Sequence, residues 1–267
     1  MEHKKPSLLS EQVIIQTGAQ KVVSNYDDIV LTPEEEQEAL RVARKRKHEL
    51  KVEQDYWDKV NKPVEYVKLT CEKLREKILI ENRDLIIDEN NGEIFNMLCA
   101  YFSGDESLES IFEGSFKKGI MLHGPVGCGK TRMMEVFQEN SFRPFVINPV
   151  RVVADEYTMK DGGANALIKF STMVPAYPQM NFGFDLLGRC FDDIGTEDSK
   201  KNFGNEVNVI QDLLYKVYDN KLLGNFHGTT NLNGHEIESA YGLRVRDRMK
   251  EMFNVINFGQ QSPSRRK

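Results

Sequence analysis

The stretch HGPVGCGKTRMM, residues 123–134, is the strongest indication of the fold. It follows an apolar run, GIMLH at 119–123, and precedes a helical pattern, which is the context that the motif G-x-x-x-x-G-K-[ST] requires. Glycine tolerates backbone angles that aim successive N–H groups at one point, and the start of the following helix adds partial positive charge there. The stretch therefore predicts a phosphate-binding turn between a strand and a helix.

The residues of this turn have separate expected roles. Lys130 is predicted to reach the β- and γ-phosphates of a nucleotide, and the Thr131 hydroxyl to occupy one position on Mg²⁺. Cys128 is interpreted as filling space in the turn. The predicted nucleotide-binding residues are Gly124, Pro125, Val126, Gly127, Cys128, Gly129, Lys130, Thr131 and Arg132.

From Lys118 onward, short apolar runs alternate with helical stretches. The expected strands are 119–123, 144–148, 184–191, 224–231 and 254–259, and the expected helices between them include 130–140, 206–220 and 234–251. Alternation of this kind is typical of a parallel sheet that is covered by helices on both faces. The sequence thus predicts an α/β domain with a parallel five-stranded sheet, over residues 113–260.

Residues 32–112 predict an all-helical region ahead of that domain. Thr32 is a plausible N-cap that forms a capping box with Glu35, and the helix that follows has few apolar residues. A second helix is predicted from an apolar stripe, and a third from GEIFNMLCAYFSGD. The stripe consists of Val64, Val67, Cys71, Leu74 and Ile78. Residues 1–31 are predicted to be a flexible arm, and 261–267 a basic tail.

Bulk composition excludes several classes of protein. Hydrophobic residues make up 40% and charged residues 29%, and no apolar run approaches the roughly 20 residues of a membrane helix. The start lacks the features of a secretory signal, which favours a cytoplasmic protein. The four cysteines are far apart and form no C-x-x-C pair, which argues against a zinc knuckle or a disulfide framework. Since the net charge is −5, contact with nucleic acid would need a local basic surface.

Two carboxylates follow the third expected strand. In LLGRCFDDIGTE, Asp192 and Asp193 come at the carboxyl end of the apolar run, where open α/β sheets bind their ligands. Asp192 is predicted to hold Mg²⁺ through water, and Asp193 to act as the base or to orient the attacking water, with Glu197 in reserve. The alternative is a simple Asp-Asp-Ile-Gly turn.

Two further segments offer polar groups. Asn231 ends the strand that contains TTN and could contact the attacking water or the γ-phosphate, although a turn or helix cap is the alternative. In YGLRVRDRMKEM, Arg244 and Arg248 lie four positions apart on one helix face, which is more often a solvated surface.

Together, GPVGCGKT, CFDDIG, TTN and YGLRVRDRM, in this order within residues 124–249, resemble the AAA+ ATPases of the bacterial replicative-helicase loader family, the DnaC and DnaI type. The pattern YG-x-R-x-x-D-R-M is the most specific part of the resemblance. The resemblance as a whole implies that residues 124–131 are Walker A, that Asp192 and Asp193 are Walker B and that Asn231 is the sensor I residue. Arg248 is then the arginine finger, with Arg244 as its neighbour.

The resemblance also implies an activity and partners. Members of the family use ATP binding and slow ATP hydrolysis as a switch, grip single-stranded DNA and hold a hexameric replicative helicase of the DnaB type through a separate N-terminal region. ATP and Mg²⁺ are the implied cofactors, and self-association through a nucleotide-bridged interface is expected because the finger acts on the next subunit. The chain departs from the DnaI type in having no residues for an N-terminal zinc site. Arg265 is either a substitute for the sensor II residue or part of a disordered basic tail.

The residues that would contact DNA are open. The run RVARKRKHELK at 41–51 could bind phosphates or could be a solvated helix face, and Lys160, Lys169 and Phe170 are candidates for a single-strand groove. Three other functions remain: an IstB-like transposition helper ATPase, a P-loop small-molecule kinase, and an adaptor that binds ATP without hydrolysing it. A kinase would not need the TTN strand tip and would carry its arginines in a mobile lid.

Overall fold

The computed structural model describes residues 30–60, 67–177, 183–197, 200–202 and 205–265. The chain divides into two units, Met1–Lys62 and Pro63–Lys267. Each unit is described by itself below. Most of the predicted N-terminal arm, together with Pro63 and Val64, lies outside the described residues.

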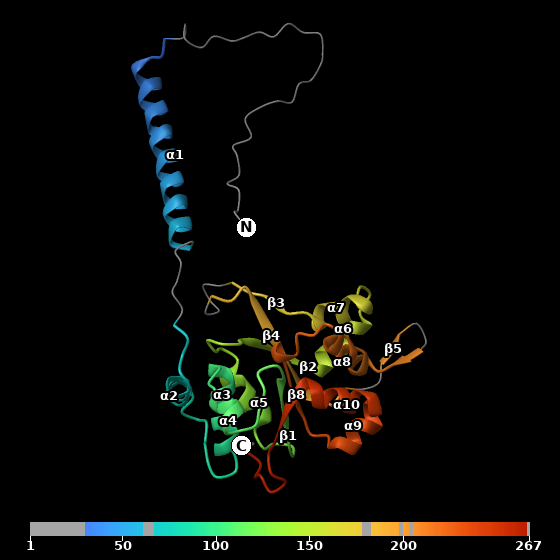
Figure 1. Ribbon diagram of the computed structural model, residues 1–267. Coiled ribbons are helices and arrows are strands. Elements are labelled where there is room, and N and C mark those ends of the chain that lie inside the picture. Colours follow the sequence, from blue (N-terminus) through green and yellow to red (C-terminus); the bar gives the residue numbers. More distant parts are fainter. Residues whose placement is uncertain (1–29, 61–66, 178–182, 198–199, 203–204, 266–267) are drawn as a thin grey trace. The chain divides into compact units, whose positions relative to one another are not determined.

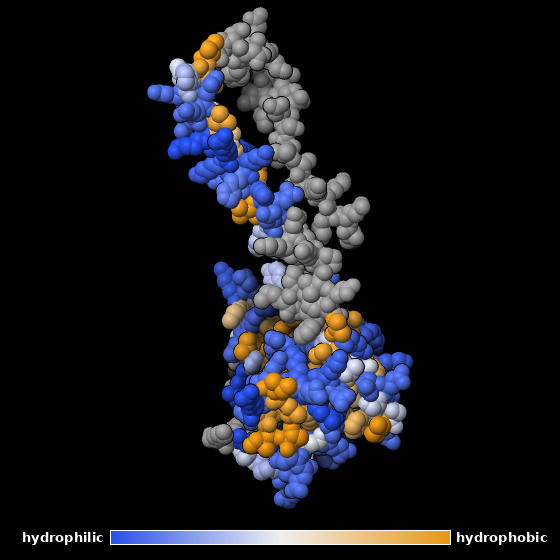
Figure 2. All heavy atoms as spheres, turned by 90° about the vertical axis from the view of Figure 1, so that its left-hand side faces the viewer, coloured by the Kyte–Doolittle hydropathy of each residue, from blue (hydrophilic) through white to orange (hydrophobic). Residues whose placement is uncertain are grey.

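The described part of the first unit is one long helix, α1 (Pro33–Val60). The predicted capping box is confirmed: the Glu35 amide donates to the Thr32 hydroxyl at 3.3 Å, and the Thr32 amide donates to the Glu35 carboxylate at 2.8 Å. The low number of apolar residues predicted a helix that mostly faces water, and even Leu50, Tyr56 and Trp57 are exposed. On the face seen in Figure 2, α1 is mainly hydrophilic with scattered hydrophobic side chains.

The second unit alternates helices and strands (Figure 1). In chain order its elements are α2 (Cys71–Glu81), α3 (Gly92–Ser103), α4 (Ser107–Ser110), β1 (Gly119–His123), α5 (Lys130–Phe137), β2 (Phe145–Pro149), α6 (Val150–Thr158), α7 (Ala164–Ser171), β3 (Val174–Pro175), β4 (Leu186–Ile194), β5 (Lys200–Asn202), β6 (Asn205–Val207), α8 (Val209–Asp219), the 3-10 turn Leu223–Asn225, β7 (Phe226–Thr230), α9 (Gly234–Tyr241), α10 (Leu243–Met252) and β8 (Phe253–Asn257).

The main sheet has the strand order β2-β4-β7-β1-β8, and all neighbours in this order are parallel. The short β3 pairs antiparallel with the start of β4, and β5 and β6 form a separate antiparallel pair. The predicted fold class is therefore confirmed: a parallel five-stranded sheet with helices, preceded by a helical N-terminal region. β1 lies between β7 and β8 and leads directly into the glycine-rich turn.

Helices cover both faces of the sheet. Alternate residues of a strand point to opposite faces, so successive residues of β1 contact different helices. Ile120 and Leu122 of β1 belong to a core cluster with residues of α2, α3 and α5. Met121, between them, belongs to a second cluster with residues of α6, α7, α8 and α10. The predicted boundary near residue 112 does not coincide with a break in packing, since α2 and α3 share a core with β1. The functional division between 32–112 and 113–260 stays a prediction.

Two local predictions were wrong. The helix predicted from the apolar stripe begins only at Cys71, where Thr70 is the N-cap, so Val67 lies outside the helix and is exposed. The single helix predicted over 234–251 is two helices, because Gly242 adopts a φ of 84° that ends α9 before α10 begins.

β4 contains a charged residue, Arg189, although the strand lies inside the sheet between β2 and β7. Its guanidinium is buried, and it donates to the carbonyl oxygens of Lys169 and Thr172, both at 2.7 Å. A buried arginine is tolerated where its donors are satisfied in this way. It ties the C-terminal end of α7 to the sheet.

Candidate functional site

The glycine-rich turn lies between β1 and α5, as the sequence predicts. Gly127 and Gly129 have φ values of 84° and 103°, which side-chain-bearing residues rarely adopt. A Cβ atom at Gly127 would also lie only 2.6 Å from the Ser264 hydroxyl oxygen. Glycine is therefore needed at this position both for its backbone angles and for space.

Lys130 is the first residue of α5 and is only 5% exposed. Its ammonium donates to the carbonyl oxygens of Gly124 at 2.9 Å and Pro125 at 3.0 Å. It also donates to the side-chain oxygen of Asn231 at 2.5 Å. Two predicted catalytic residues are thus brought together: Lys130 at the start of α5 and Asn231 directly after β7.

Thr131 and Asp192, the two predicted metal ligands, are in direct contact. The Thr131 hydroxyl donates to Asp192 Oδ1 at 2.9 Å, and the Thr229 hydroxyl donates to the same oxygen at 2.7 Å. No cluster of three or more His, Cys, Asp or Glu able to hold a metal occurs among the described residues. A hydroxyl and one carboxylate still fit Mg²⁺, which is usually held by one or two carboxylates together with waters and substrate phosphates.

Asp193 has an unusual backbone. Its φ is 60°, and the pairing of β4 with β7 is irregular between Phe191 and Ile194. Such bulges and left-handed residues re-aim side chains and are concentrated at functional sites. The Asp193 amide donates to the Thr229 hydroxyl at 2.9 Å, whereas its carboxylate has no hydrogen-bond partner within the described ranges. The bulge thus leaves one carboxylate beside the cavity available for chemistry.

Glu197, the second candidate for the catalytic base, is hydrogen-bonded to other protein groups. Its carboxylate accepts a hydrogen bond from the Gly195 amide at 2.9 Å and a short one from the Tyr241 hydroxyl. Burial, and then the charge of Glu197, raises the pKa of Tyr241, so the phenol remains a donor to this carboxylate. Glu197 does not line the cavity described next.

A cavity of about 860 Å³ opens beside the glycine-rich turn, and this volume is within the range of ordinary ligand pockets. It is lined by Val126 to Met133 of the turn and α5, by Asp193 and Asn231, and by residues that the sequence did not indicate. The latter are Asp84, Leu85, Ile86, Asp88, Asn91, Arg151, Thr196, Pro263 and Ser264. Arg265, which the sequence analysis named as a candidate substitute for the sensor II residue, also lines the cavity. Gly124 and Pro125, although predicted, do not line it.

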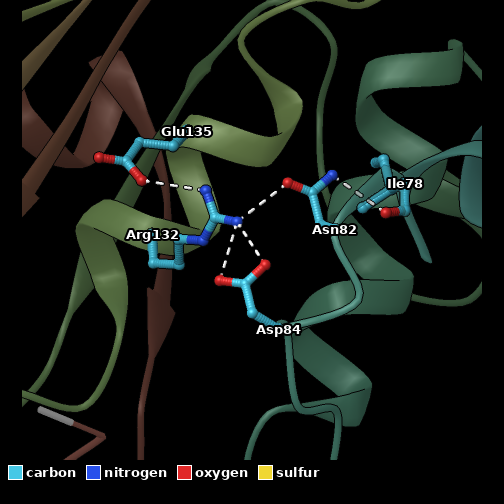
Figure 3. Close-up of polar contacts among 5 residues, drawn as sticks. All are labelled: Ile78, Asn82, Asp84, Arg132 and Glu135. Carbon is cyan, nitrogen blue, oxygen red and sulfur yellow. Dashed lines mark hydrogen bonds and ion pairs between the residues drawn. The ribbon is translucent and has the colours of Figure 1, made fainter. Parts of the chain in front are cut away.

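Arg132, predicted to bind nucleotide, lines the cavity but has protein partners (Figure 3). Its Nη2 donates to Asn82 Oδ1 and to Asp84 Oδ1, both at 3.0 Å. Its Nη1 donates to Glu135 at 3.3 Å. The guanidinium therefore ties the first turn of α5 to the segment that follows α2.

The two predicted finger arginines lie away from this cavity. The Arg248 guanidinium lies over the rings of Tyr215, at 4.9 Å, and Tyr218, at 4.4 Å, and its side chain is 28% exposed. Arg244 is exposed and makes no hydrogen bond or ion pair within the described residues. Neither arginine lines the cavity of its own chain, and their role as finger residues stays a prediction.

One DNA-contact candidate is wrong. Phe170 is only 3% exposed and belongs to the core, so it cannot stack on a base. Lys169 is paired with Glu156 at 2.7 Å, whereas Lys160 is exposed. The basic run at 41–51 lies on the exposed α1. Within the described residues, no helix is long and apolar enough to cross a membrane.

Neither a family model nor a curated protein sequence matches the chain. Among solved structures, the DnaC helicase loader has 13% identity and a TM-score of 0.44, over 66% of this chain and 93% of that one. A provisionally assigned primosome component from Streptococcus pyogenes serotype M3 has 14% identity and a TM-score of 0.43, over 66% and 83%. AMPPCP-bound DnaA from Aquifex aeolicus has 15% identity and a TM-score of 0.43, over 66% of this chain and 49% of its own.

These likenesses concern the fold alone. At such identities and TM-scores the similarity carries no information about activity, so the function has to be inferred from the motifs and from the side chains around the cavity.

Proposed function

We propose that this protein is an ATPase that binds a hexameric replicative helicase of the DnaB type and loads it onto single-stranded DNA, switched by ATP binding and hydrolysis. The observation that supports the ATPase activity best is that one cavity is lined by Lys130, by Thr131, which is bonded to Asp192, and by Asp193, whose carboxylate has no partner among the described residues. The order of motifs along the chain supports the helicase-loader assignment.

In this proposal the turn binds the phosphates of ATP through backbone N–H groups and through Lys130. Thr131 and Asp192 would hold Mg²⁺, which would supply positive charge to neutralise the phosphates. Asp193 accepts a proton from the attacking water, and Asn231 helps to orient that water. The partly exposed guanidinium of Arg248 acts on the cavity of a neighbouring subunit, which requires self-association around the nucleotide.

The helicase-binding role is assigned to the N-terminal helical region, and α1 supports this assignment. Over the described part of its unit, α1 is a capped helix whose large apolar side chains, including Leu50 and Trp57, are exposed. Apolar side chains on an otherwise polar helix are suited to a protein partner. We place the protein in the cytoplasm, where replicative helicases act.

The decisive experiment is a pull-down of the purified protein with the helicase of its host, in the presence of ATP, Mg²⁺ and single-stranded DNA. Retention of the helicase, reduced by Lys130→Ala, is the expected result. Retention of a transposase instead would favour the IstB-like helper ATPase. Nucleotide binding without turnover in every assembly state would favour an adaptor, and transfer of the γ-phosphate to a small molecule would favour a kinase.

A further inference from the structure

A segment beyond β8 runs alongside the glycine-rich turn. We call residues 259–265 the strap. The Arg265 amide donates to the carbonyl oxygen of Gly127 at 2.8 Å. Pro263, Ser264 and Arg265 line the cavity, so the strap forms part of its wall. The strap thus lies against the same turn that is proposed to bind phosphate.

The side chain of Arg265 continues from the turn to the segment between α2 and α3. Its Nη2 lies 2.9 Å from Asp88 Oδ1 and 2.8 Å from Asp88 Oδ2. Asp88 is itself fixed, because its Oδ1 accepts from the Asn90 amide at 2.9 Å and its own amide donates to Asn91 at 2.8 Å. The hydrogen bond from Arg265 lowers the pKa of Asp88, which keeps the carboxylate charged. The Arg265–Asp88 ion pair therefore joins the strap to the segment between α2 and α3, and both segments line the cavity.

We propose that the Arg265–Asp88 pair is a latch that holds the strap as a removable wall of the nucleotide cavity and so slows the release of a bound nucleoside triphosphate or diphosphate. The proposal rests on the proposed nucleotide binding and adds residues that control the lifetime of the complex. Arg265 and Asp88 are positioning residues in this scheme, and Lys130 with the turn remains the binding machinery.

Three observations support an Arg265–Asp88 pair that opens and closes over one that stays closed. The cavity has about 860 Å³ with the strap closed, which leaves room for a nucleotide behind it. The pair is partly exposed, with 22% of Arg265 and 33% of Asp88 accessible, and exposed ion pairs are weak enough to open. Arg265 Nε is buried without a hydrogen-bond partner among the described residues, so the closed joint is not fully satisfied.

The test measures release of a fluorescent ATP or ADP analogue, with Mg²⁺, by stopped-flow displacement. Asp88→Asn and Arg265→Ala should each raise the dissociation rate constant about tenfold, the loss expected for a charge-assisted hydrogen bond. The double variant should be no faster than Arg265→Ala alone, because that change already removes the pair with Asp88 together with the Nη1 contact to the Ile86 carbonyl at 3.4 Å. The charge-exchanged pair, Asp88→Arg with Arg265→Asp, should recover part of the slow release.

Arg246→Ala is a matched control, since it removes an ion pair of similar exposure, with Glu238, outside this cavity. It should leave release unchanged. A protein that ends at Ser264 provides a second variant, should Asp88→Asn fail to fold. Absence of nucleotide affinity in the unaltered protein would refute the proposed function and the latch together. Normal affinity with unchanged release in the Asp88 and Arg265 variants would refute the latch alone.

Discussion

The Thr131 hydroxyl donates a hydrogen bond to the Asp192 carboxylate at 2.9 Å, although the two residues are 61 positions apart in the chain. This contact joins the start of α5 to the end of β4 and connects Asp192 to the cavity that Thr131 and Asp193 line. The pair can form because β1, which leads to α5, and β4 are parallel strands of one sheet whose carboxyl ends lie at the same edge, with β7 between them.

Lys130→Ala should abolish most nucleotide binding while the protein stays folded. The lysine is the cation closest to the phosphate turn, and its loss should weaken ATP binding by about 100-fold, or about 2.7 kcal/mol. Isothermal titration calorimetry with Mg²⁺ and ATP measures this change. Lys117→Ala, which alters an exposed lysine ahead of β1, should bind ATP normally. Equal affinities of the two variants would contradict the role of Lys130.

Asp193→Asn should separate binding from hydrolysis. Because Asp193 is the cavity carboxylate without a described partner, its loss should reduce kcat by about 100-fold or more, as for a missing general base. The Kd for ATP should change little. Phosphate release under saturating ATP measures kcat, and unchanged turnover would remove the base assignment.

Glu197→Gln tests the alternative carboxylate. Since Glu197 is bonded to Tyr241 and to the Gly195 amide, its change should affect stability more than turnover. A loss of kcat as large as that of Asp193→Asn, without a change in Tm, would shift the base assignment to Glu197.

Arg248→Ala should lose ATPase activity by about 1,000-fold or more, within the range seen for arginine fingers, and should be rescued in mixtures. When mixed with Lys130→Ala protein, an intact Arg248 from one subunit can meet an intact Lys130 from another. ATPase assays over a range of mixing ratios measure this rescue. No recovery in mixtures that demonstrably co-assemble would count against action across subunits.

Arg244→Ala is the companion to that experiment. Arg248 packs on Tyr215 and Tyr218, so its removal also costs packing, whereas the exposed Arg244 has no described partner to lose. Thermal melts of both variants separate a fall in stability from a fall in activity. Should Arg244→Ala alone abolish turnover at unchanged Tm, it would replace Arg248 as the finger.

The buried His227 is expected to make the folded protein less stable in acid. Its ring is buried among Tyr101, Phe102 and Phe145, its Nδ1 accepts from the Ile120 amide, and burial lowers its pKa from 6.5 to about 3. The unfolded chain therefore takes up this proton at a higher pH than the folded protein does. Stability should fall as the pH drops from 6.5 towards 3, by up to about 1.4 kcal/mol per pH unit from this residue.

Urea unfolding at several pH values checks this expectation. His227→Phe removes the titrating group but leaves the Ile120 amide without its acceptor, so it should cost about 1–3 kcal/mol at neutral pH. In the same variant the slope of stability against pH below 6.5 should become shallower. An identical slope in both proteins would show that other groups control the acid sensitivity.

The sequence by itself determined the fold class and the phosphate turn. Both depend on local information: the alternation of apolar runs with helical periods, and glycines at positions where Gly127 and Gly129 adopt positive φ. The expected strand at 119–123 is β1 as observed, and Asp192 and Asp193 lie at the end of β4 as expected. These features are set by residues that are near neighbours in the chain.

Only the tertiary structure decided which distant groups share the cavity. Nothing in the local pattern pairs Arg265 with Asp88, directs Arg132 to Asp84 or binds Glu197 to Tyr241. These contacts follow from the order of strands in the sheet and from the course of the strap, which bring together residues far apart in sequence. A charged side chain finds its partner through that packing, and its identity alone does not reveal which partner it will meet.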